Sequence, residues 1–450
     1  MRLTMEKKSR AFALLVLGLS FAALMLAELS PERGAAVMAA YVAPAGWVLL
    51  GLSLRRGKTK GMLRLGGALL GWFVVSRFLL GEHYLEDSQE AFRLFFAACI
   101  TALPFAQVWD EDGRRRGLMV VCWLGALASS LLAWLGIASV LTGRTLTLPL
   151  LGSRVYVQGG RLFALEYPNL GACFFLLGLI GTGYLALTLR KKWFIPLALL
   201  MGLGLWAGIA FTVSRTVMIQ CAAVLAGAAF LLVWRSPLRP AWLRVLAGIL
   251  AAVAALVLTY MSFTWVVEGV SHFGAQAAEV AETGAAAEIA ARPLENDLLT
   301  MTGRTDAYRG FFELVKHRPK VLVLGVLNKN LTVELNRYIP HDTLAAFYHA
   351  HNAYIQTTLQ LGLPGLLFAL WCSFLAVRSA VRILLLAPKG RVSAAEGLVS
   401  LSCLALLLGA ISEVYLFTDQ FSMCNFAFML LLGYALQTEK RLRTEGSGKA

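Results

Sequence analysis

The histidines and arginines that border the apolar stretches are the residues of this sequence best suited to chemistry. The run Tyr348-His349-Ala350-His351-Asn352 comes directly before a long apolar segment. Histidine is the side chain that exchanges a proton near neutral pH, so His351 is a candidate general base. Asn352 is a good N-cap, because its side-chain oxygen can accept bonds from free N–H groups of a first helical turn. We therefore expect His351 at the mouth of a helix, with Tyr348 and His349 as supporting neighbours.

The same histidines are open to two other interpretations. His349 and His351 are also consistent with an interfacial pair that only caps the helix. A zinc site that uses both of them with His341 would need a further ligand, and no cysteine lies near them in the sequence. The sequence therefore predicts no metal site.

Three arginines are candidates for binding an anion. Arg215 lies in a turn between two apolar runs, where an arginine is costly unless it pairs, faces a cavity or snorkels. Its planar guanidinium can bind two phosphate oxygens at once, which makes it a candidate phosphate clamp. Arg304 precedes an amphipathic segment, and Arg161 precedes Pro168-Asn169, which should cap the next helix. Each of the three is equally open to interpretation as an ordinary interfacial or loop arginine.

The composition is that of a membrane protein. The chain has 450 residues, of which 58% are hydrophobic and 15% are charged, and its mean hydropathy is +0.68. Apolar runs of about 20 residues, the length that crosses a bilayer as a helix, recur along almost the whole chain. Backbone polar groups must be paired within lipid, so these spans should be helical. We therefore expect an all-α integral membrane protein with about 12 transmembrane helices.

Charge between the apolar runs indicates the topology. The expected spans are residues 11–27, 34–54, 62–80, 91–109, 117–141, 170–189, 193–213, 217–234, 245–263, 353–377, 397–417 and 420–437. The basic short loops all fall on one side, which the positive-inside rule makes cytoplasmic together with both termini. The net charge of +15 therefore reports topology and not nucleic-acid binding. All seven cysteines fall in apolar spans without a CxxC pair, so no disulfide or zinc framework is implied.

This topology divides the chain at one long outer segment. Residues 1–263 hold the first nine helices, 264–351 form an extracytoplasmic loop that carries part of the active site, 352–437 hold helices ten to twelve, and 438–450 form a cytoplasmic tail. In the loop, Tyr308, Phe311, Phe312 and Val315 have the spacing of one helix face, which predicts a short amphipathic helix that ends before Pro319. Glu413 and Asp419 fall near the outer ends of the last two spans, where either could pair with an arginine or a substrate hydroxyl.

The order of these motifs resembles a known family. RLFALEYPNLGA, then SRT at a tight turn, then GRTDAYRGFFELVKHRP and LGVLN in the long loop, and finally HAHNAYIQTTLQLGLPGLL follow one another. This order is similar to that of the O-antigen ligase and O-antigen polymerase superfamily of bacterial membrane glycosyltransferases. The resemblance covers roughly residues 161–367.

The resemblance implies transfer of a glycan from a polyprenyl-diphosphate-linked donor to an acceptor hydroxyl, in ligation or polymerisation of a cell-surface polysaccharide. By position, His351 would be the general base, and Arg215 and Arg304, with Arg161, would bind the diphosphate. The implied place is the outer face of the bacterial cytoplasmic (inner) membrane. The implied partners are the lipid-linked donor, a glycan or lipid-linked acceptor and membrane lipids, without nucleic acid, metal or cofactor.

Two other classes of function remain as alternatives. A multi-pass secondary transporter of an envelope precursor or small anion would account for the number of spans. It is disfavoured by the long outer loop at 264–351 and by the scarcity of acidic residues within the apolar spans, where an ion relay would lie. A non-catalytic scaffold of an envelope complex is the third class.

Overall fold

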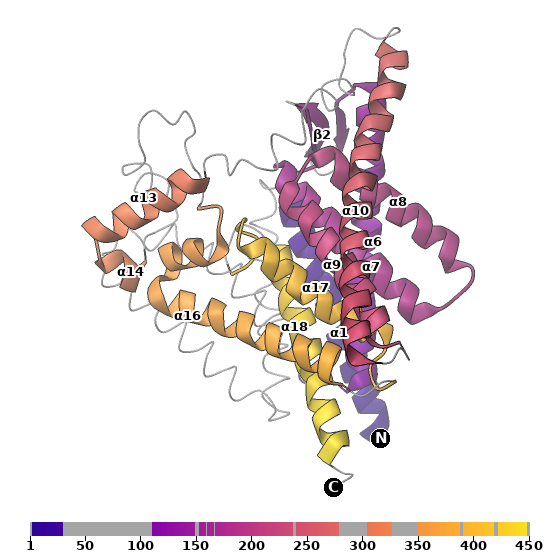
Figure 1. The fold of residues 1–450 in the computed structure, drawn as a ribbon, viewed down its shortest axis with the longest axis vertical. Helices are drawn as coiled ribbons and strands as arrows, with labels where there is room; N and C mark the ends of the chain where they lie inside the picture. Colours follow the sequence, from indigo (N-terminus) through magenta and orange to yellow (C-terminus); the bar gives the residue numbers. More distant parts are fainter. Residues whose placement is uncertain are drawn as a thin grey trace.

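The computed structural model describes residues 2–29, 110–148, 153–158, 160–165, 167–236, 240–278, 304–325, 350–387, 390–417 and 422–447. These residues form a bundle of long helices with a small sheet at one end (Figure 1). The spans expected at 34–54, 62–80 and 91–109 lie outside the described residues. So do Tyr348, His349 and Asp419.

Most of the described residues are helical. The helices are α1 (Arg2–Leu29), α6 (Glu111–Thr142), α7 (Pro168–Leu189), α8 (Phe194–Thr212), α9 (Arg215–Trp234), α10 (Ala241–Ala278), α13 (Arg304–His317), α14 (Lys320–Leu324), α16 (Ala353–Val381), the π-helical η3 (Arg382–Leu386), α17 (Ala394–Ala410) and α18 (Ser422–Ser447). Six candidate membrane spans occur in the part of the chain that the structure describes, namely α6, α7, α8, α9, Ala241–Gly269 of α10, and α16 with η3. A mostly helical membrane protein is thus confirmed, while the count of about 12 spans stays a prediction.

The expectation of an all-α chain is wrong between α6 and α7. This segment forms an antiparallel sheet of β1 (Leu146–Leu148), β2 (Ser153–Gln158) and β3 (Arg161–Phe163), in the order β1-β2-β3. Gln158 of β2 pairs with Arg161 of β3, and Gly160, directly before β3, has a φ of +67°, which glycine adopts readily. Val155 and Leu162 are fully buried on one face of the sheet. The sheet therefore packs its apolar face against the bundle and holds Arg161 in place.

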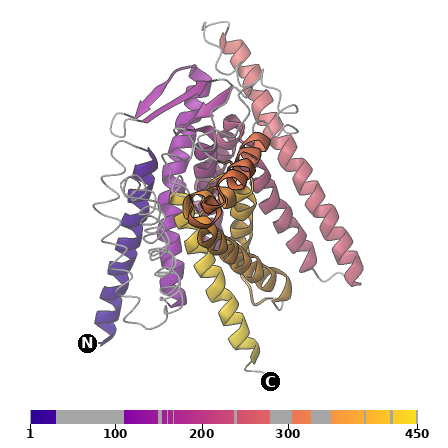
Figure 2. The ribbon, with the colours of Figure 1, turned by 90° about the vertical axis from the view of Figure 1, so that its left-hand side faces the viewer.

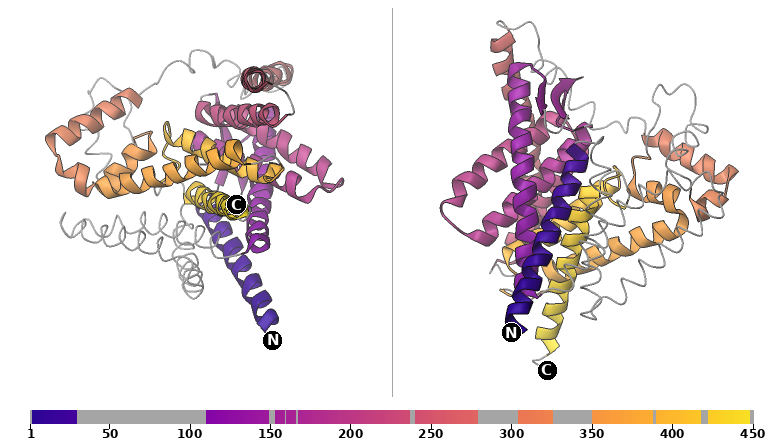
Figure 3. Two further views of the ribbon diagram at one scale, coloured as in Figure 1. Left: turned by 60° about the horizontal axis from the view of Figure 1, so that its bottom comes forward. Right: turned by 180° about the vertical axis from the view of Figure 1, so that it is seen from behind.

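The core of the bundle surrounds α7, which packs against α6, α8, α9, α17 and α18. Figure 2 shows α1 beside α6 at one flank of the molecule and α10 at the other. α10 packs along α9 (Figure 3) and leaves nearly all of its apolar membrane-length segment uncovered. An apolar helix that exposes most of its side chains fits a lipid surrounding. α10 also continues to Ala278, so the segment predicted as a loop from residue 264 begins as helix.

The predicted amphipathic helix is α13, which ends at His317, before Pro319 as expected. Phe311 and Leu314 face inward and form a small core with Val321 of α14 and Leu359 of α16. Phe312 is 65% exposed, so only part of the predicted apolar stripe is buried. The pair α13–α14 is therefore attached to the first half of α16.

α16 begins at Ala353, as predicted, and is broken at Gly362, whose φ is +70°. The break lies against α14, so closely that a Cβ on Gly362 would overlap the carbonyl oxygen of Val323. A Cβ on Gly325, at the end of α14, would likewise lie 2.7 Å from the carbonyl oxygen of Gln360. The two segments therefore meet backbone to backbone, which only glycine allows at these positions.

Gly362→Ala is expected to detach α14 from α16. The new methyl group overlaps Val323 and forces alanine into the left-handed region, which costs about 1–3 kcal/mol. Thermal unfolding in detergent and limited proteolysis of the α13–α14 segment measure the effect. Gly202→Ala in α8 is the matched control, because nothing lies within 4 Å of the added Cβ. Wild-type stability and proteolysis of Gly362→Ala would contradict the close contact.

α17 ends at Ala410, earlier than the span predicted to reach residue 417. The following turn is held by side chains of other helices: the N–H of Phe417 donates to Asn425 at 2.6 Å, and Thr357 donates to the Phe417 carbonyl at 2.9 Å. The apolar composition of this stretch suggested a continuing helix, but the chain leaves the helix after Ala410 and turns, and it reaches a φ of +62° at Phe417. The turn brings Glu413 into the bundle.

Candidate active site

His351 lies at the N-terminus of α16 in the left-handed backbone region, with a φ of +49°. Histidine is among the few residues enriched there, and strained backbones cluster at functional sites. Asn352 caps the helix as predicted: its Oδ1 accepts from the N–H of Tyr354 at 2.9 Å and of Ile355 at 3.1 Å. The N–H of Ala350 donates to the buried Gln356 side chain at 3.0 Å. Local bonds on both sides therefore hold the histidine at the helix mouth.

The side chain of His351 faces a buried carboxylate. Its Nδ1 lies 3.6 Å from Oε2 of Glu413, and the exposed fractions of the two side chains are 27% and 2%. The other carboxylate oxygen, Oε1, accepts from Nδ2 of Asn169 at 2.9 Å. His351 is thus open to solvent on one side and faces a carboxylate on the other.

Arg161 joins this group from β3. Its Nε donates to the carbonyl of Thr212 at 2.9 Å, and its Nη2 donates to Oδ1 of Asn169 at 2.5 Å. The Asn169 amide therefore connects the Arg161 guanidinium to Glu413. α7 begins at Pro168 as expected, but the Asn169 side chain makes these two tertiary bonds instead of capping the helix.

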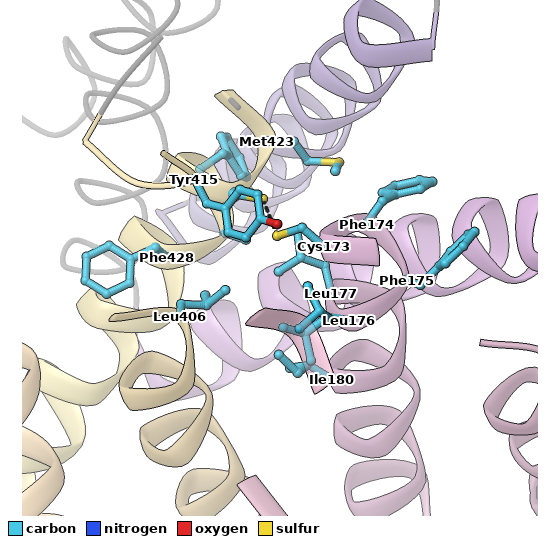
Figure 4. Close-up of a cluster of buried hydrophobic side chains, with 14 of the residues drawn as sticks. Cys173, Phe174, Phe175, Leu176, Leu177, Ile180, Leu406, Tyr415, Met423 and Phe428 are labelled. Atoms are coloured by element: carbon cyan, nitrogen blue, oxygen red, sulfur yellow. Dashed lines mark hydrogen bonds between the residues drawn. The ribbon is translucent and has the colours of Figure 1, made fainter. Parts of the chain in front are cut away.

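The phenol of Tyr415 contacts the backbone of Asn169, the residue that connects Arg161 to Glu413. Its hydroxyl donates to the Asn169 carbonyl at 2.9 Å. Burial raises the pKa of Tyr415 well above its usual range, and the nearby Glu413 carboxylate raises it further. Figure 4 shows Tyr415 beside Cys173, in an apolar cluster from α7, α17 and α18. The phenol therefore stays neutral and remains a hydrogen-bond donor.

Arg215 is the first residue of α9, directly after a sharp turn in which Val213 has a φ of +51°. It is half-buried. The side chains of Thr216 and Ser412 are hydrogen-bonded at 3.0 Å, which ties the start of α9 to the turn that carries Glu413. The free N–H groups of a helix N-terminus add to the attraction of a cation for an anion there.

Arg304 is the first residue of α13. Tyr308, one helical turn later, donates from its hydroxyl to the carbonyls of His351 and Ile411, both at 3.4 Å. The start of α13 therefore lies one helical turn from a residue that contacts the His351 backbone, although the Arg304 side chain is not among those that the structure describes.

The structure thus brings together parts that are distant in the sequence. Arg161, Arg215 and His351 come to one end of the bundle, and the α13 helix that begins with Arg304 lies beside them. Sequence reasoning overlooked Asn169 as a bridging residue and Tyr308 as a polar contact. It expected Glu413 to pair with an arginine or a substrate hydroxyl and did not predict its position beside His351. An acidic residue at the end of an apolar run is the one signal that pointed to Glu413.

An apolar cavity lies away from these residues. Its volume is about 490 Å³, and it is lined by side chains of α7, α8, α9 and α17, among them Trp206 and Leu225. None of the candidate residues lines it, so the polar site at the helix ends is distinct from this cavity.

Residues 197–370 match the family described as O-antigen ligase. The match begins in α8, contains Arg215 and Arg304, and ends in α16, beyond His351. Arg161, Asn169 and Glu413 lie outside the matched residues. No curated protein matches the chain. The predicted resemblance to the O-antigen ligase and polymerase superfamily is confirmed over the matched stretch.

Proposed function

From the match of residues 197–370 to the O-antigen ligase family, we propose that this chain is a membrane glycosyltransferase of the bacterial inner membrane. It transfers a glycan from a polyprenyl-diphosphate-linked donor to an acceptor hydroxyl and so ligates or polymerises a cell-surface polysaccharide. The observation that carries the proposal is the convergence of His351, Arg161 and Arg215 at one end of a bundle of apolar helices. We place this end on the extracytoplasmic face, with both termini in the cytoplasm.

The residues suit the charges that such a reaction develops. Breaking the bond between the anomeric carbon and the diphosphate leaves negative charge on the leaving group. Arginines fixed in a water-poor site stabilise that charge more strongly than solvent does, and this is the role we propose for Arg215 and Arg304, with Arg161 beside them. The energy comes from the activated donor, so no nucleotide is needed.

His351 supplies the complementary part of the reaction. It takes the proton of the acceptor hydroxyl while the hydroxyl oxygen attacks the anomeric carbon. A direct displacement of this kind inverts the anomeric centre. Both substrates are bound at the membrane. Holding them side by side in a fixed orientation removes much of the entropic cost of bringing the two reacting groups together. Tyr348, His349 and Asn352 are proposed to support the histidine.

Transfer is expected to proceed without a metal, because the proposed charge-stabilising groups are guanidinium groups. The test uses the full chain in proteoliposomes, a polyprenyl-diphosphate glycan as donor and a glycan acceptor, with the product followed by mass spectrometry. Transfer in excess EDTA equal to that without it is the expected result. Loss of transfer in EDTA and its recovery with Mg²⁺ would contradict metal independence.

The same proteoliposomes separate the proposal from a transporter. Movement of the donor across the membrane without formation of a new glycosidic bond would overturn the proposed function and support the transporter. A donor analogue with one phosphate is the matched control. It should react more slowly, because the leaving group is poorer and the clamp contacts fewer oxygens.

A further inference from the structure

Glu413 is a buried carboxylate that the proposed chemistry does not yet use. It is 2% exposed, and its two oxygens face different groups: Oε1 accepts from Asn169, and Oε2 lies 3.6 Å from Nδ1 of His351. Burying a carboxylate is expensive unless polar or charged groups compensate it. Its position beside the proposed base therefore indicates a role in the site and not in the apolar packing.

Asn169 fixes the direction in which Glu413 faces. A guanidinium only donates hydrogen bonds and a carboxylate only accepts them. The amide between Arg161 and Glu413 must therefore turn its oxygen to the arginine, at 2.5 Å, and its nitrogen to the carboxylate, at 2.9 Å. Because the arginine is itself anchored on the Thr212 carbonyl, the carboxylate is held from the side opposite His351.

The backbones that carry the two side chains are also joined. The carbonyl of Ile411, two residues before Glu413, accepts from Nδ2 of Asn352 at 2.9 Å and from the Tyr308 hydroxyl at 3.4 Å. Tyr308 also donates to the carbonyl of His351 at 3.4 Å. These bonds hold the turn that carries Glu413 against the start of α16, and so they bring the backbones of Glu413 and His351 close together.

We propose that Glu413, oriented by Asn169, is the positioning residue of His351, a role that rests on the proposed glycan transfer. A carboxylate opposite Nδ1 selects the tautomer with its proton on Nδ1 and leaves Nε2 free to accept a proton. The 3.6 Å separation exceeds a hydrogen bond. A shift of a few tenths of an ångström closes it, and catalytic hydrogen bonds commonly tighten only when substrate is bound.

In the proposed transfer step, His351 accepts the proton of the acceptor hydroxyl and the diphosphate leaves with the electron pair of the broken bond. The acceptor O–H gives its proton to Nε2 of His351, and its oxygen forms the new bond to the anomeric carbon. The bond from that carbon to the diphosphate oxygen breaks, and its electron pair leaves with the diphosphate. The imidazolium keeps its Nδ1–H towards the carboxylate of Glu413, and it later releases the Nε2 proton to water.

Glu413→Gln tests this role because it keeps the volume and removes the charge. The glutamine amide can donate to Nδ1 and so favours the tautomer with Nε2 protonated, which cannot act as base. We expect kcat for transfer to fall by about 100-fold or more, at the lower end of the contribution of a positioned base. We expect KM for the donor to stay within about threefold of wild type and the midpoint of thermal unfolding in detergent to stay close to that of wild type, because the substitution keeps the volume of the side chain.

Glu413→Asp separates positioning from packing. Aspartate keeps an acceptor-only carboxylate but loses one methylene group, so it is expected to retain a higher kcat than Glu413→Gln. A role in packing predicts the reverse order, because glutamine preserves the volume and aspartate leaves a cavity. The reverse order would overturn the proposal.

Glu439→Gln is the matched control. Glu439 is a buried carboxylate of α18 that pairs with Arg378 of α16 and Arg382 of η3, at the opposite end of α16 from His351. Its loss is expected to lower stability while transfer per folded molecule stays at the wild-type rate. Transfer by Glu413→Gln within threefold of wild type would overturn the positioning role. Absence of transfer by the wild-type chain would instead overturn the proposed function.

Discussion

Replacing His351 by alanine is expected to slow glycan transfer by about 10²–10⁴-fold, the contribution of a positioned general base. Without the imidazole, no base accepts the proton of the acceptor hydroxyl as its oxygen attacks, so the hydroxyl is a weaker nucleophile. The diphosphate contacts are untouched, so KM for the donor should change little. Initial rates in proteoliposomes, with expression and thermal unfolding measured in parallel, give the effect.

The backbone of His351 requires a second variant. Alanine is disfavoured at a φ of +49°, whereas asparagine is tolerated in the left-handed region, so His351→Asn should fold at least as well. Both variants lack the base and should be equally slow. His317→Ala is the control, because that histidine is 55% exposed and bonds to the Glu313 carbonyl of its own helix. A rate for His351→Asn within severalfold of wild type would show that the base lies elsewhere.

Replacing Arg215 by alanine is expected to reduce kcat/KM for the donor by about 10²–10³-fold, as for the loss of one fixed donor to a developing anion. The effect should exceed any change in stability, since Arg215 is half-buried at a helix start and is not part of the apolar core. Measurement at several donor concentrations separates binding of the diphosphate from stabilisation of the leaving group.

Two further variants sharpen the test of Arg215. Arg235→Ala changes the arginine at the other end of α9, which donates to the carbonyls of Ile383 and Leu384, and it should leave kcat/KM unchanged. Arg215→Lys keeps the positive charge but loses the planar guanidinium that donates to two phosphate oxygens at once. If Arg215 binds the diphosphate in this way, the rate of Arg215→Lys should lie between those of wild type and Arg215→Ala. Wild-type kinetics of Arg215→Ala would remove this residue from the proposed site.

Local patterns made part of this site predictable. Asn352 before an apolar run indicated a capped helix start, and Arg215 between two spans indicated a tight turn; the structure contains both. Each signal depends on neighbours within a few residues, for which side-chain type and spacing carry most of the information. The amphipathic helix α13 was predictable for the same reason.

The contacts that complete the site were not predictable in this way. Asn169 and Glu413 are hydrogen-bonded across 244 positions, and neither carries a local motif that names the other. The turn after Ala410 was missed because its residues are as apolar as the helix they follow. The strands before Arg161 were missed because short alternating segments give a weak signal beside long apolar spans.

The contact between Gly362 and α14 determines which residues of α13 can change without disturbing the site. α13 and α14 are attached to α16 largely through backbone atoms, at Gly325 and Gly362, and through a few inward side chains. Substitutions on the outer face of α13, such as at Arg309 or the exposed Phe312, leave that attachment in place. In the proposed enzyme, residues on this outer face can therefore change while His351 keeps its position.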